Sequence, residues 1–368
     1  MGRLTVVQLL PALDAGGVER STLEIAEALV RNGHRALVVS AGGRLLPRLE
    51  AIGAEHVALA VGRKSPLAFR HVPALRRIFA GADIVHARSR MPAWLAWRAL
   101  RGMRGRRPAF ATTVHGLNSP SGYSQVMTRG ERVVCVSATV RAHLLAHYPG
   151  LDRDRLLVIP RGIDPAAFPR VPAPDRAGRQ VLARSMPQLG GNGPLLLLPG
   201  RGTRRKGHAD ALALLARLRA QGTDARLWMP GVVQASRMRY VDGLRAQAQA
   251  LGVAEAVAFS EPTDAIAAAY AACDLVLQLS RRPEAFGRTV VEALVVGRPV
   301  LGWAHGGVGE LMAQLQPAGA VPAFDEGILA TRALALLAAP PDPPAAMPYT
   351  LQAMQEATLA LYRSMVAT

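Results

Sequence analysis

The chain alternates short apolar runs with longer segments in which apolar residues recur at the spacing of a helix. Its first apolar run, Leu4–Leu10, has the length of a strand, and the next segment, Val18–Arg31, places Leu23, Ala26 and Val30 on one helical face. Six more strands are predicted in the first half, at Ala36–Val39, Val57–Leu59, Asp83–His86, Ala109–Val114, Arg132–Val136 and Leu156–Ile159. Because these strands are almost continuously apolar and are separated by helices, they predict a parallel sheet covered on both faces.

The alternation stops in the middle of the chain and then begins again. Residues 165–193 are rich in proline and glycine, with one short helix expected near Gln180–Met186. Strands of a second series are predicted at Leu195–Leu198, Ala225–Met229, Ala256–Phe259, Leu275–Leu279 and Val300–Leu301. A last helix, Leu351–Met365, follows a proline-rich stretch at 340–344.

With 368 residues, the chain has room for two domains of ordinary size. The predicted fold class is therefore α/β, with two Rossmann-like, doubly wound parallel-sheet domains facing a cleft. We expect the first domain at 1–168, a linker at 169–192, the second domain at 193–345 and a terminal helix at 346–368. Ligands of such sheets bind beyond the carboxyl ends of the strands, so the loops that follow strands should hold the chemistry.

The sequence predicts a cytoplasmic protein without a membrane span. No apolar run reaches the roughly 18 residues that a spanning helix needs. The N-terminal apolar run superficially resembles a secretion signal, but Pro11 interrupts it and a polar stretch follows, so a buried first strand is the preferred interpretation. The two cysteines, Cys135 and Cys273, lie within apolar strand-like runs, which indicates buried thiols in a reducing compartment.

The balance of charge is strongly basic, with 44 lysine and arginine residues against 26 acidic ones and a net charge of +18. Lys64 and Lys206 are the only lysines in the sequence, and the other basic residues are arginine. A basic block, defined as residues 61–110, has one acid, Asp83, and these basic residues: Arg63, Lys64, Arg70, Arg76, Arg77, Arg88, Arg90, Arg98, Arg101, Arg104, Arg106 and Arg107. The block favours an anionic partner, namely nucleic acid, an anionic membrane surface or a phosphorylated acceptor. A solvated arginine face is the alternative.

Two strand ends of the first domain carry candidate ligand-binding residues. Gly16 and Gly17 lie where the first strand turns into a helix, and glycine there lets backbone N–H groups approach an anion. A tight turn that merely requires glycine is the alternative. His115, followed by Gly116 after the strand Ala109–Val114, would place an imidazole in the cleft, within reach of a hydroxyl or a developing charge. A structural histidine is the alternative there.

A glycine-rich basic loop, residues 199–207, follows the first strand of the second domain. Arg201 offers a planar fork and Lys206 a point charge, which together fit a diphosphate. The loop lacks the Walker A pattern, because Lys206 precedes the second glycine and His208 stands where serine or threonine is required. An ordinary basic loop on a basic protein is the alternative.

The loop and helix after Leu275–Leu279 carry two acids, Glu284 and Glu292. Phe286 and Gly287 are expected to begin the helix, so that their N–H groups face a phosphate or sugar oxygen. Glu292 has apolar neighbours on the helix and needs polar partners, which ribose hydroxyls would supply. Alternatively, Glu284 caps the helix and Glu292 is a salt-bridged surface residue.

No metal site is expected from the sequence. His143 and His147 have helical spacing but lack the glutamate of an HExxH zinc motif, and no Asp-x-Asp pair is present to bridge a metal ion and a diphosphate. A second glycine turn, at 304–310, opens another helix, either as part of the cleft or as a plain turn.

Taken in order, these motifs resemble those of glycosyltransferase family 4, retaining enzymes of the GT-B fold, over essentially the whole chain. The resemblance rests on Gly16–Arg20, His115-Gly116, Val158–Asp164, Gly200-Arg201 with Lys206-Gly207, and the E-x7-E pair Glu284 and Glu292. Two positions depart from the family pattern. Arg161 stands where asparagine is usual, and Arg205 stands where an aromatic residue often precedes the lysine.

The resemblance implies which residues bind the donor diphosphate. Arg201 and Lys206 would neutralise it and stabilise the nucleoside diphosphate as it leaves, with Gly17, Phe286 and Gly287 also lining the phosphates. No cofactor and no metal are implied, because the nucleotide diphosphate sugar is itself the donor substrate.

The resemblance also implies catalytic residues and a domain assignment. His115 and Glu284 would hold the donor sugar as catalytic residues, and Glu292 would hold the ribose. The hexose would be transferred with retention of configuration. The first domain would bind the acceptor, the second the nucleotide sugar, and the helix at 346–368 would cross back onto the first domain.

The segment 85–94, inside the basic block, resembles bacterial relatives that build the lipopolysaccharide core. It implies cell-envelope glycan synthesis, an anionic glycolipid or oligosaccharide acceptor, and peripheral binding to the inner face of the inner membrane, with Arg88 and Arg90 as acceptor or membrane contacts. A nucleotide-sugar 2-epimerase of the same fold is one alternative function. A nucleic-acid-binding protein is another, disfavoured because aromatic residues are 5% and no motif for reading nucleic acid is present.

Overall fold

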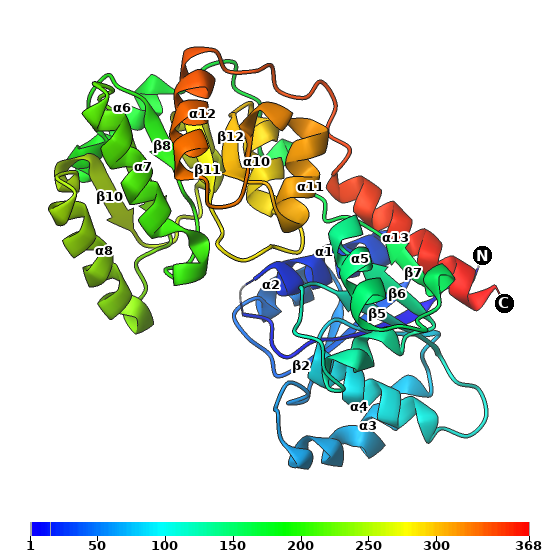
Figure 1. Cartoon of the computed structure of the whole chain (residues 1–368). Coiled ribbons are helices and arrows are strands. Elements are labelled where there is room, and N and C mark those ends of the chain that lie inside the picture. Colours follow the sequence, from blue (N-terminus) through cyan, green and yellow to red (C-terminus); the bar gives the residue numbers. More distant parts are fainter. Residues whose placement is uncertain (1, 15, 368) are drawn as a thin grey trace. The chain divides into compact units, whose positions relative to one another are not determined.

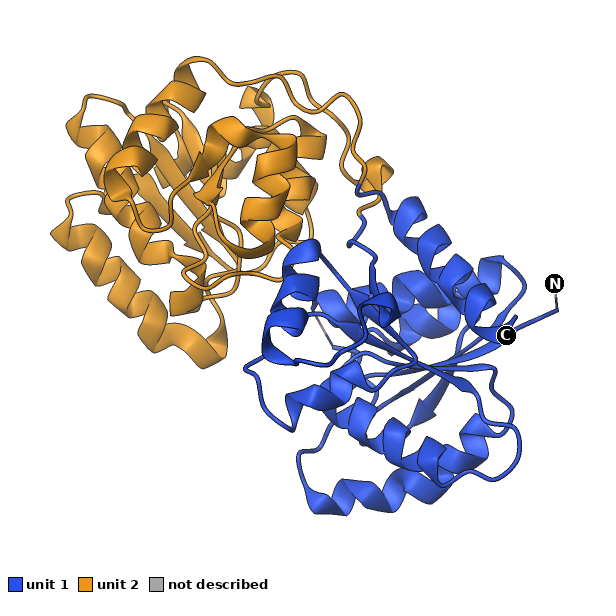
Figure 2. Ribbon diagram, turned by 45° about the vertical axis from the view of Figure 1, so that its right-hand side comes forward, with its two compact units in different colours: residues 1–162, 349–368 blue, residues 163–348 orange. Residues whose placement is uncertain are grey.

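The computed structural model describes residues 2–14 and 16–367, whose contacts divide the chain into two compact units (Figure 1 and Figure 2). Unit 1 runs to Gly162 and also contains the residues from Tyr349 onward, whereas unit 2 is Ile163–Pro348. Ala15, which belongs to the predicted glycine turn, lies outside the described residues. Each unit is a parallel α/β domain and is described by itself.

Unit 1 is a seven-stranded parallel sheet with the order β3-β2-β1-β4-β5-β6-β7 and helices on both faces (Figure 1). All seven predicted strands are present, with ends shifted by a residue or two. Its elements are β1 Thr5–Leu9, α1 Gly17–Arg31, β2 Arg35–Ser40, α2 Leu46–Ala51, β3 Glu55–Ala58, α3 Val72–Phe79, β4 Ile84–Ala87, α4 Arg90–Arg101, β5 Ala109–Val114, β6 Arg132–Cys135, α5 Ala138–His147, β7 Leu156–Val158 and α13 Leu351–Val366.

The C-terminal helix α13 packs within unit 1 (Figure 2). Met354, Leu359 and Tyr362 belong to the same buried cluster as the apolar face of α1, where Leu23 and Leu29 are at most 5% exposed. Burying each such side chain contributes about 1.5–3 kcal/mol. This confirms that the terminal helix returns to the first domain.

Unit 2 is a six-stranded parallel sheet with the order β10-β9-β8-β11-β12-β13. The edge strand β13 was missed in the sequence because two residues are too short to produce an apolar run. The elements are α6 Arg176–Ser185, β8 Leu195–Leu197, α7 His208–Ala220, β9 Arg226–Pro230, α8 Met238–Ala250, β10 Val257–Ser260, α9 Ile266–Ala272, β11 Leu275–Gln278, α10 Arg288–Val296, β12 Val300–Trp303, α11 Gly306–Leu315, β13 Ala320–Val321 and α12 Glu326–Ala338.

The segment expected to be a linker, 169–192, packs as part of unit 2 instead. Its helix α6 carries Arg179, which is 2% exposed and donates to the carbonyl groups of Leu189 at 2.8 Å and Gly193 at 2.6 Å. The Asp175 N–H also donates to the Ala271 carbonyl at 2.8 Å. Prolines and glycines in this segment therefore shape a packed connection, and the two units divide at Gly162 and Pro348.

Two other expectations concern single features of the chain. Cys135 and Cys273 are buried free thiols, as predicted, and burial raises the pKa of Cys135 to about 12. Within the described part of the chain, no helix has both the length and the apolar character needed to span a bilayer.

Candidate functional site

The strand order reverses once in each sheet, and candidate residues follow the strands at these two points. In unit 1 the reversal lies between β1 and β4, which are followed by Gly17 and Arg88. In unit 2 it lies between β8 and β11, which are followed by the loops that carry Lys206 and Glu284. Open parallel sheets bind ligands beyond the strand ends at such points. The fold therefore places these residues beyond the strand ends at the two reversal points.

Lys206 and Glu284 form an ion pair in unit 2, with Nζ donating to Oε1 at 2.6 Å. Lys206 ends the 3₁₀ turn Arg204–Lys206, and the following Gly207 has a left-handed φ of 74°. A Cβ at Gly207 would overlap the carbonyl group of Leu279 at the end of β11. Glycine is therefore required for the basic loop to lie against the Glu284 loop.

Glu284 is ionised by its surroundings despite being largely buried. Burial acts to raise the pKa of this carboxyl, but Lys206, Ser280 and the nearby His305 together hold the pKa below its ordinary value. The Ser280 hydroxyl donates to Oε1 at 2.5 Å. A carboxylate in this state accepts hydrogen bonds and cannot donate them. Glu284 does not cap the next helix, because α10 begins at Arg288 without a side-chain cap.

The second glycine turn, at 304–310, holds the Glu284 loop in place. The His305 Nε2 atom lies 2.7 Å from the Ser280 carbonyl oxygen, and the Gly307 N–H donates to the Glu284 carbonyl at 2.7 Å. Gly306 has a φ of 60°, and a Cβ there would lie 2.7 Å from the Glu284 carbonyl oxygen. The glycines of this turn thus support the site by close backbone approach.

Arg281 joins the Glu284 loop to the basic loop. Its N–H donates to the Arg205 carbonyl at 2.8 Å, and its guanidinium pairs with the buried Asp210 at 2.6 Å. The guanidinium also lies 5.0 Å from the ring centroid of Phe324. The two loops are therefore held together by backbone and side-chain contacts besides the Lys206–Glu284 pair.

The other predicted phosphate-binding residues of unit 2 are arranged in different ways. Arg201 is exposed, and among the described residues its guanidinium has no hydrogen-bond or ion-pair partner. Phe286 is buried, with 6% of the residue exposed, and its phosphate-binding role stays a prediction. Gly287 is the N-cap of α10 with φ 111°, so the helix begins at Arg288, two residues after the predicted start at Phe286. The first-turn N–H groups of α10 are donors suited to an anion.

Glu292 is buried and already has protein partners. Its carboxylate accepts hydrogen bonds from Arg288 Nε to Oε1 at 2.7 Å and from the Tyr270 hydroxyl to Oε2 at 2.9 Å. Burial and the adjacent carboxylate raise the pKa of Tyr270 well above its ordinary value, so the phenol stays protonated. The alternative of a salt-bridged surface residue is confirmed in part. Glu292 does form an ion pair, but with 7% of the residue exposed it is buried and does not lie on the surface. Its ribose-binding role stays a prediction.

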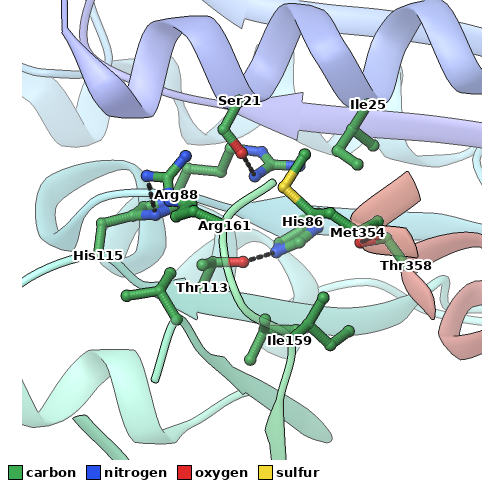
Figure 3. Close-up of a pocket in the computed structure, with 12 residues that line it drawn as sticks. Ser21, Ile25, His86, Arg88, Thr113, His115, Ile159, Arg161, Met354 and Thr358 are labelled. Atoms are coloured by element: carbon green, nitrogen blue, oxygen red, sulfur yellow. Dashed lines mark hydrogen bonds between the residues drawn. The ribbon is translucent and has the colours of Figure 1, made fainter. Parts of the chain in front are cut away.

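In unit 1, the Arg161 guanidinium contacts His115 and the backbone of Gly17, and Figure 3 shows its contact with His115. Arg161 follows β7, is 9% exposed, and lies with Nη2 2.7 Å from His115 Nδ1. Its Nη1 donates to the Gly17 carbonyl oxygen at 2.6 Å. The position that departs from the family pattern is therefore the one that ties His115 to the glycine turn.

Beside this cluster lies a cavity of about 20 Å³, lined by Ser21, His86, Arg88, Thr113, His115 and Arg161 among others (Figure 3). Arg88 is 3% exposed and donates from Nε to Gln8 Oε1 at 2.7 Å. Within the described residues, Arg88 Nη2 and His115 Nε2 have no hydrogen-bond partner. Such burial is incompatible with Arg88 contacting a membrane surface. Its role toward an acceptor stays a prediction.

Both cavity-lining imidazoles are neutral. His86 is bonded through Nδ1 to the Tyr362 hydroxyl and through Nε2 to the Thr113 hydroxyl, each at 2.6 Å. Burial and then Arg88 lower the pKa of His86 well below its ordinary value. Burial, followed by Arg161 and Arg88, does the same to the pKa of His115. The cavity is thus positively charged through arginine alone.

Arg90, the second tentative acceptor or membrane contact, begins α4. Its Nη1 donates to the Ser124 hydroxyl at 3.2 Å, and its guanidinium lies 5.1 Å from the ring centroid of Tyr123. These contacts fix the side chain at the carboxyl edge of the sheet of unit 1. The role of Arg90 toward an acceptor or a membrane stays a prediction.

Both halves of the chain match models of known families. Residues 15–167 match Glycosyltransferase Family 4, and residues 184–343 match Glycosyl transferases group 1. The chain is also similar to the crystal structure of a glycosyltransferase from Rickettsia africae, with 25% identity, a TM-score of 0.86, and coverage of 100% of this chain and 99% of that one.

Two further solved structures share the fold at lower identity. HepE of Anabaena, in complex with UDP and glucose, has a TM-score of 0.76 at 21% identity, with coverage of 98% of this chain and 100% of that one. WaaG, a glycosyltransferase involved in lipopolysaccharide biosynthesis, has a TM-score of 0.66 at 19% identity, with coverage of 99% of this chain and 95% of that one. At these identities the likeness shows the GT-B fold.

Curated relatives match only part of the chain. The D-inositol 3-phosphate glycosyltransferase of Segniliparus rotundus is 29% identical over 189 residues, which are 51% of this chain and 40% of that protein. That of Salinispora tropica is 33% identical over 194 residues, which are 51% of this chain and 39% of that protein. The chain thus matches about two fifths of the length of these relatives.

Several contact residues were not singled out in the sequence. Ser280 and Tyr270 bond the two acids, and His305 supports the Glu284 loop, yet each is an ordinary residue in its local pattern. Arg161 had a usable signal, because it replaces an expected asparagine in a segment leading out of the first domain. The length of an arginine side chain at this position could have predicted a contact with a residue that follows another strand, as Arg161 makes with His115.

Proposed function

Because the chain belongs to glycosyltransferase family 4 and has the GT-B fold, we propose that it transfers a hexose from a nucleotide diphosphate sugar to a glycan or glycolipid acceptor, with retention of configuration. The observation that carries the proposal is the Lys206–Glu284 ion pair, 2.6 Å long, where the strand order of unit 2 reverses. It places a cation suited to a diphosphate beside a carboxylate suited to sugar hydroxyls.

The cations of the basic loop act on the leaving group. As the bond between the hexose and the diphosphate breaks, negative charge grows on the departing phosphate oxygens. Lys206 stabilises that charge together with Arg201, which is exposed and has no partner among the described residues, and the N-terminus of α10 adds oriented N–H groups. Lys206 leaves its bond to Glu284 or shares it when the diphosphate binds.

Glu284 acts on the sugar. Because its pKa is held below the ordinary value, the carboxylate is ionised and accepts hydrogen bonds from hydroxyl groups. The Ser280 hydroxyl and the 304–310 turn restrict its position, so little ordering is needed when a hexose binds. His115 is the corresponding ligand-binding residue of unit 1, and Glu292 is assigned to the ribose.

A donor screen followed by a transfer assay tests this proposal. UDP-, GDP- and ADP-linked hexoses are ranked by thermal shift, and transfer of labelled hexose from the best donor is then measured with and without acceptor glycolipids. The proposal predicts acceptor-dependent transfer with retained configuration, and a strong loss of this transfer in Glu284→Gln. Conversion of the donor to its C2 epimer without any acceptor would instead establish the 2-epimerase. Absence of donor binding across the panel would contradict both.

We further propose an anionic acceptor and cell-envelope glycan synthesis, as in lipopolysaccharide core assembly. Relatives are named for an inositol phosphate acceptor and WaaG for lipopolysaccharide, and both kinds of acceptor are anionic. The basic block of unit 1 has the complementary charge. Soluble anionic glycans should inhibit transfer, and added salt should weaken this inhibition. A transfer rate that does not depend on the charge of the acceptor would contradict the proposal.

The same block supports peripheral binding to an anionic membrane. In the 3₁₀ helix Pro66–His71, Leu67 is 72% and Phe69 is 39% exposed, next to Arg63, Lys64 and Arg70. Exposed apolar side chains flanked by cations favour the interface of an anionic bilayer. Cosedimentation with phosphatidylglycerol vesicles should fall in Leu67→Ser/Phe69→Ser and remain unchanged in Leu251→Ser, which alters a comparably exposed apolar side chain of unit 2. Equal binding to neutral vesicles would contradict the proposal.

A further inference from the structure

The bond between Arg161 and His115 determines where the imidazole proton lies. A guanidinium group has five N–H donors and no acceptor. His115 Nδ1, at 2.7 Å from Arg161 Nη2, must therefore be the acceptor and carry no proton. A neutral imidazole with a bare Nδ1 has its proton on Nε2.

The guanidinium that imposes this state is anchored on both arms. While Nη2 faces His115, Nη1 donates to the Gly17 carbonyl oxygen at 2.6 Å. Arg161 is 9% exposed, so water cannot easily replace either bond. The side chain is thus held in the geometry that keeps Nδ1 unprotonated.

The surroundings of the ring also oppose a second proton. Arg161 beyond β7 and Arg88 beyond β4 are the cations that face it, and His86 on β4 is a neutral imidazole. The cavity side is completed by Ser21 from α1 and Thr358 from α13, which do not titrate, while Tyr362 is bonded to His86. Burial first, and these cations second, lower the pKa of His115 well below its ordinary value.

The remaining ring nitrogen is unused by the protein. Among the described residues His115 Nε2 has no hydrogen-bond partner, and neither does Arg88 Nη2 in the same cavity (Figure 3). A buried donor without a partner costs about 1–3 kcal/mol. Both groups are donors, and the described residues that line the cavity include no carboxylate, so the matching chemistry is an oxygen with free lone pairs.

We propose that Arg161 is a positioning residue that locks His115 as the neutral Nε2–H tautomer, so that His115 donates a hydrogen bond to a substrate oxygen and does not act as a base. The oxygen belongs to a hydroxyl or phosphoryl group of a bound substrate. The tautomer follows from unit 1 alone, whereas its use in hexose transfer rests on the proposed function.

Nuclear magnetic resonance of the full-length protein with ¹⁵N-labelled histidine tests the tautomer directly. His115→Gln identifies the resonances of His115. The proposal predicts that wild-type His115 is neutral with the proton on Nε2, and that it does not titrate between about pH 5 and pH 8, the range in which ordinary histidines do. A proton on Nδ1, or a doubly protonated ring at neutral pH, would overturn it.

Substitution of the arginine tests the lock. In Arg161→Asn, which restores the residue usual at this position, His115 should lose the single tautomer and its pKa should rise toward the ordinary range, because one cation and one donor are removed. Arg161→Lys retains charge and a donor and should preserve the Nε2–H form at least partly. The matched control is Arg155→Asn, since Arg155 donates to the carbonyl groups of Thr128 and Gly130 and contacts no histidine. An unchanged His115 spectrum in Arg161→Asn would overturn the lock.

Kinetics distinguish this inference from the proposed function. If both hold, Arg161→Asn lowers kcat/KM about tenfold, the loss expected for one misplaced hydrogen bond, and adds an acid limb to the pH profile as His115 becomes titratable. If His115 has the Nε2–H tautomer but the protein has no transfer activity, the inference about Arg161 stands and the proposed function is wrong. Unchanged kinetics with an altered tautomer would show that the Nε2–H bond has no part in transfer.

Discussion

The two units hold their candidate residues in chemically different ways. In unit 2 a cation and a carboxylate, Lys206 and Glu284, neutralise each other at 2.6 Å. In unit 1 the Arg161 guanidinium donates to neutral acceptors, an imidazole nitrogen and the carbonyl of Gly17. An ion pair can open and exchange partners when a charged ligand binds, whereas these two neutral acceptors do not neutralise the charge of the guanidinium.

Under the proposed function, the two units would divide the work of transfer between them. In unit 2 one cation is paired, and a second, Arg201, has no partner in the part of the chain that the structure describes; such a site suits a diphosphate that is charged both before and after the reaction. A cavity with two arginines and two neutral imidazoles suits oxygens that only accept hydrogen bonds. We expect substitutions in unit 2 to act on donor binding and bond cleavage, and those in unit 1 to act on orientation.

The largest effect is expected for Glu284→Gln. The change keeps the shape but removes the anion that accepts sugar hydroxyls and pairs with Lys206, so kcat/KM for transfer should fall about 10²–10³-fold. Initial rates at limiting donor measure it. Asp224→Asn is the matched control, because it breaks exposed ion pairs with Arg219 and Arg226 in the same unit. A loss below about threefold in Glu284→Gln would remove Glu284 from the catalytic residues.

Gly207→Ala should cause the next largest effect, on stability. The new Cβ would overlap the Leu279 carbonyl at a residue with φ 74°, so unfolding free energy should fall by about 3 kcal/mol or more. Gly222→Ala has a similar φ of 86° with open space, and should cost about 1 kcal/mol. Gly17→Ala in unit 1, where the Cβ would lie 3.8 Å from Arg161 Nη2, should be nearly neutral. Urea denaturation measures all three, and equal losses would contradict the close loop approach in unit 2.

The pH dependence of Lys206→Met tests the electrostatics of unit 2. Glu284 has a lowered pKa because Lys206, Ser280 and His305 outweigh burial, so wild-type activity is present above that pKa and is lost as the pH falls through it. Without Lys206, burial dominates, the pKa rises, and the acid limb of kcat/KM moves to higher pH. The pH profile of the residual activity measures this shift. An acid limb that does not move would show that Lys206 does not set the ionisation of Glu284.

The smallest effect is expected for Glu292→Gln. The amide retains one acceptor for Arg288 or Tyr270 and still offers polar atoms to a ribose, so donor KM should rise several-fold, less than about tenfold. The midpoint temperature of thermal unfolding, Tm, should be only slightly lower than that of the wild type. A deoxyribonucleotide donor separates the roles: if Glu292 binds ribose, the variant should no longer discriminate against that donor, while unchanged discrimination would assign Glu292 to structure alone.

The same comparison explains what the sequence could predict. The strands of both sheets were predictable because buried parallel strands are continuous apolar runs, whereas β13 has only two residues. The position of Lys206 and Glu284 at one edge of the sheet of unit 2 was predictable because both lie in loops that follow strands, whereas their ion pair was not predicted and their roles toward a donor stay predictions. The unit 1 site was only half predictable. Gly17 and His115 follow strands, but Arg161 enters through a side chain whose direction depends on the folded sheet.

Two features were predicted incorrectly from the sequence because contacts with distant segments determine them. Residues 169–192 have a linker-like composition, yet Arg179 ties them to unit 2 through bonds to carbonyl groups. Arg88 lies in a basic block that suggests a surface, yet it is 3% exposed because Gln8 and Ser21 supply acceptors beneath the helix α1. Composition describes a segment, whereas burial depends on acceptors that distant segments provide.

The central claim is that the Lys206 loop of unit 2 binds the donor diphosphate, and a titration of the donor tests it most directly. The nucleotide sugar with the largest thermal shift is titrated calorimetrically into the wild type, Lys206→Met and Arg204→Met; Arg204 is an exposed cation in the same 3₁₀ turn. The account predicts that Kd rises at least about tenfold in Lys206→Met, because one charge-assisted phosphate contact is lost, and less than about twofold in Arg204→Met. Equal affinity of the wild type and Lys206→Met would contradict it.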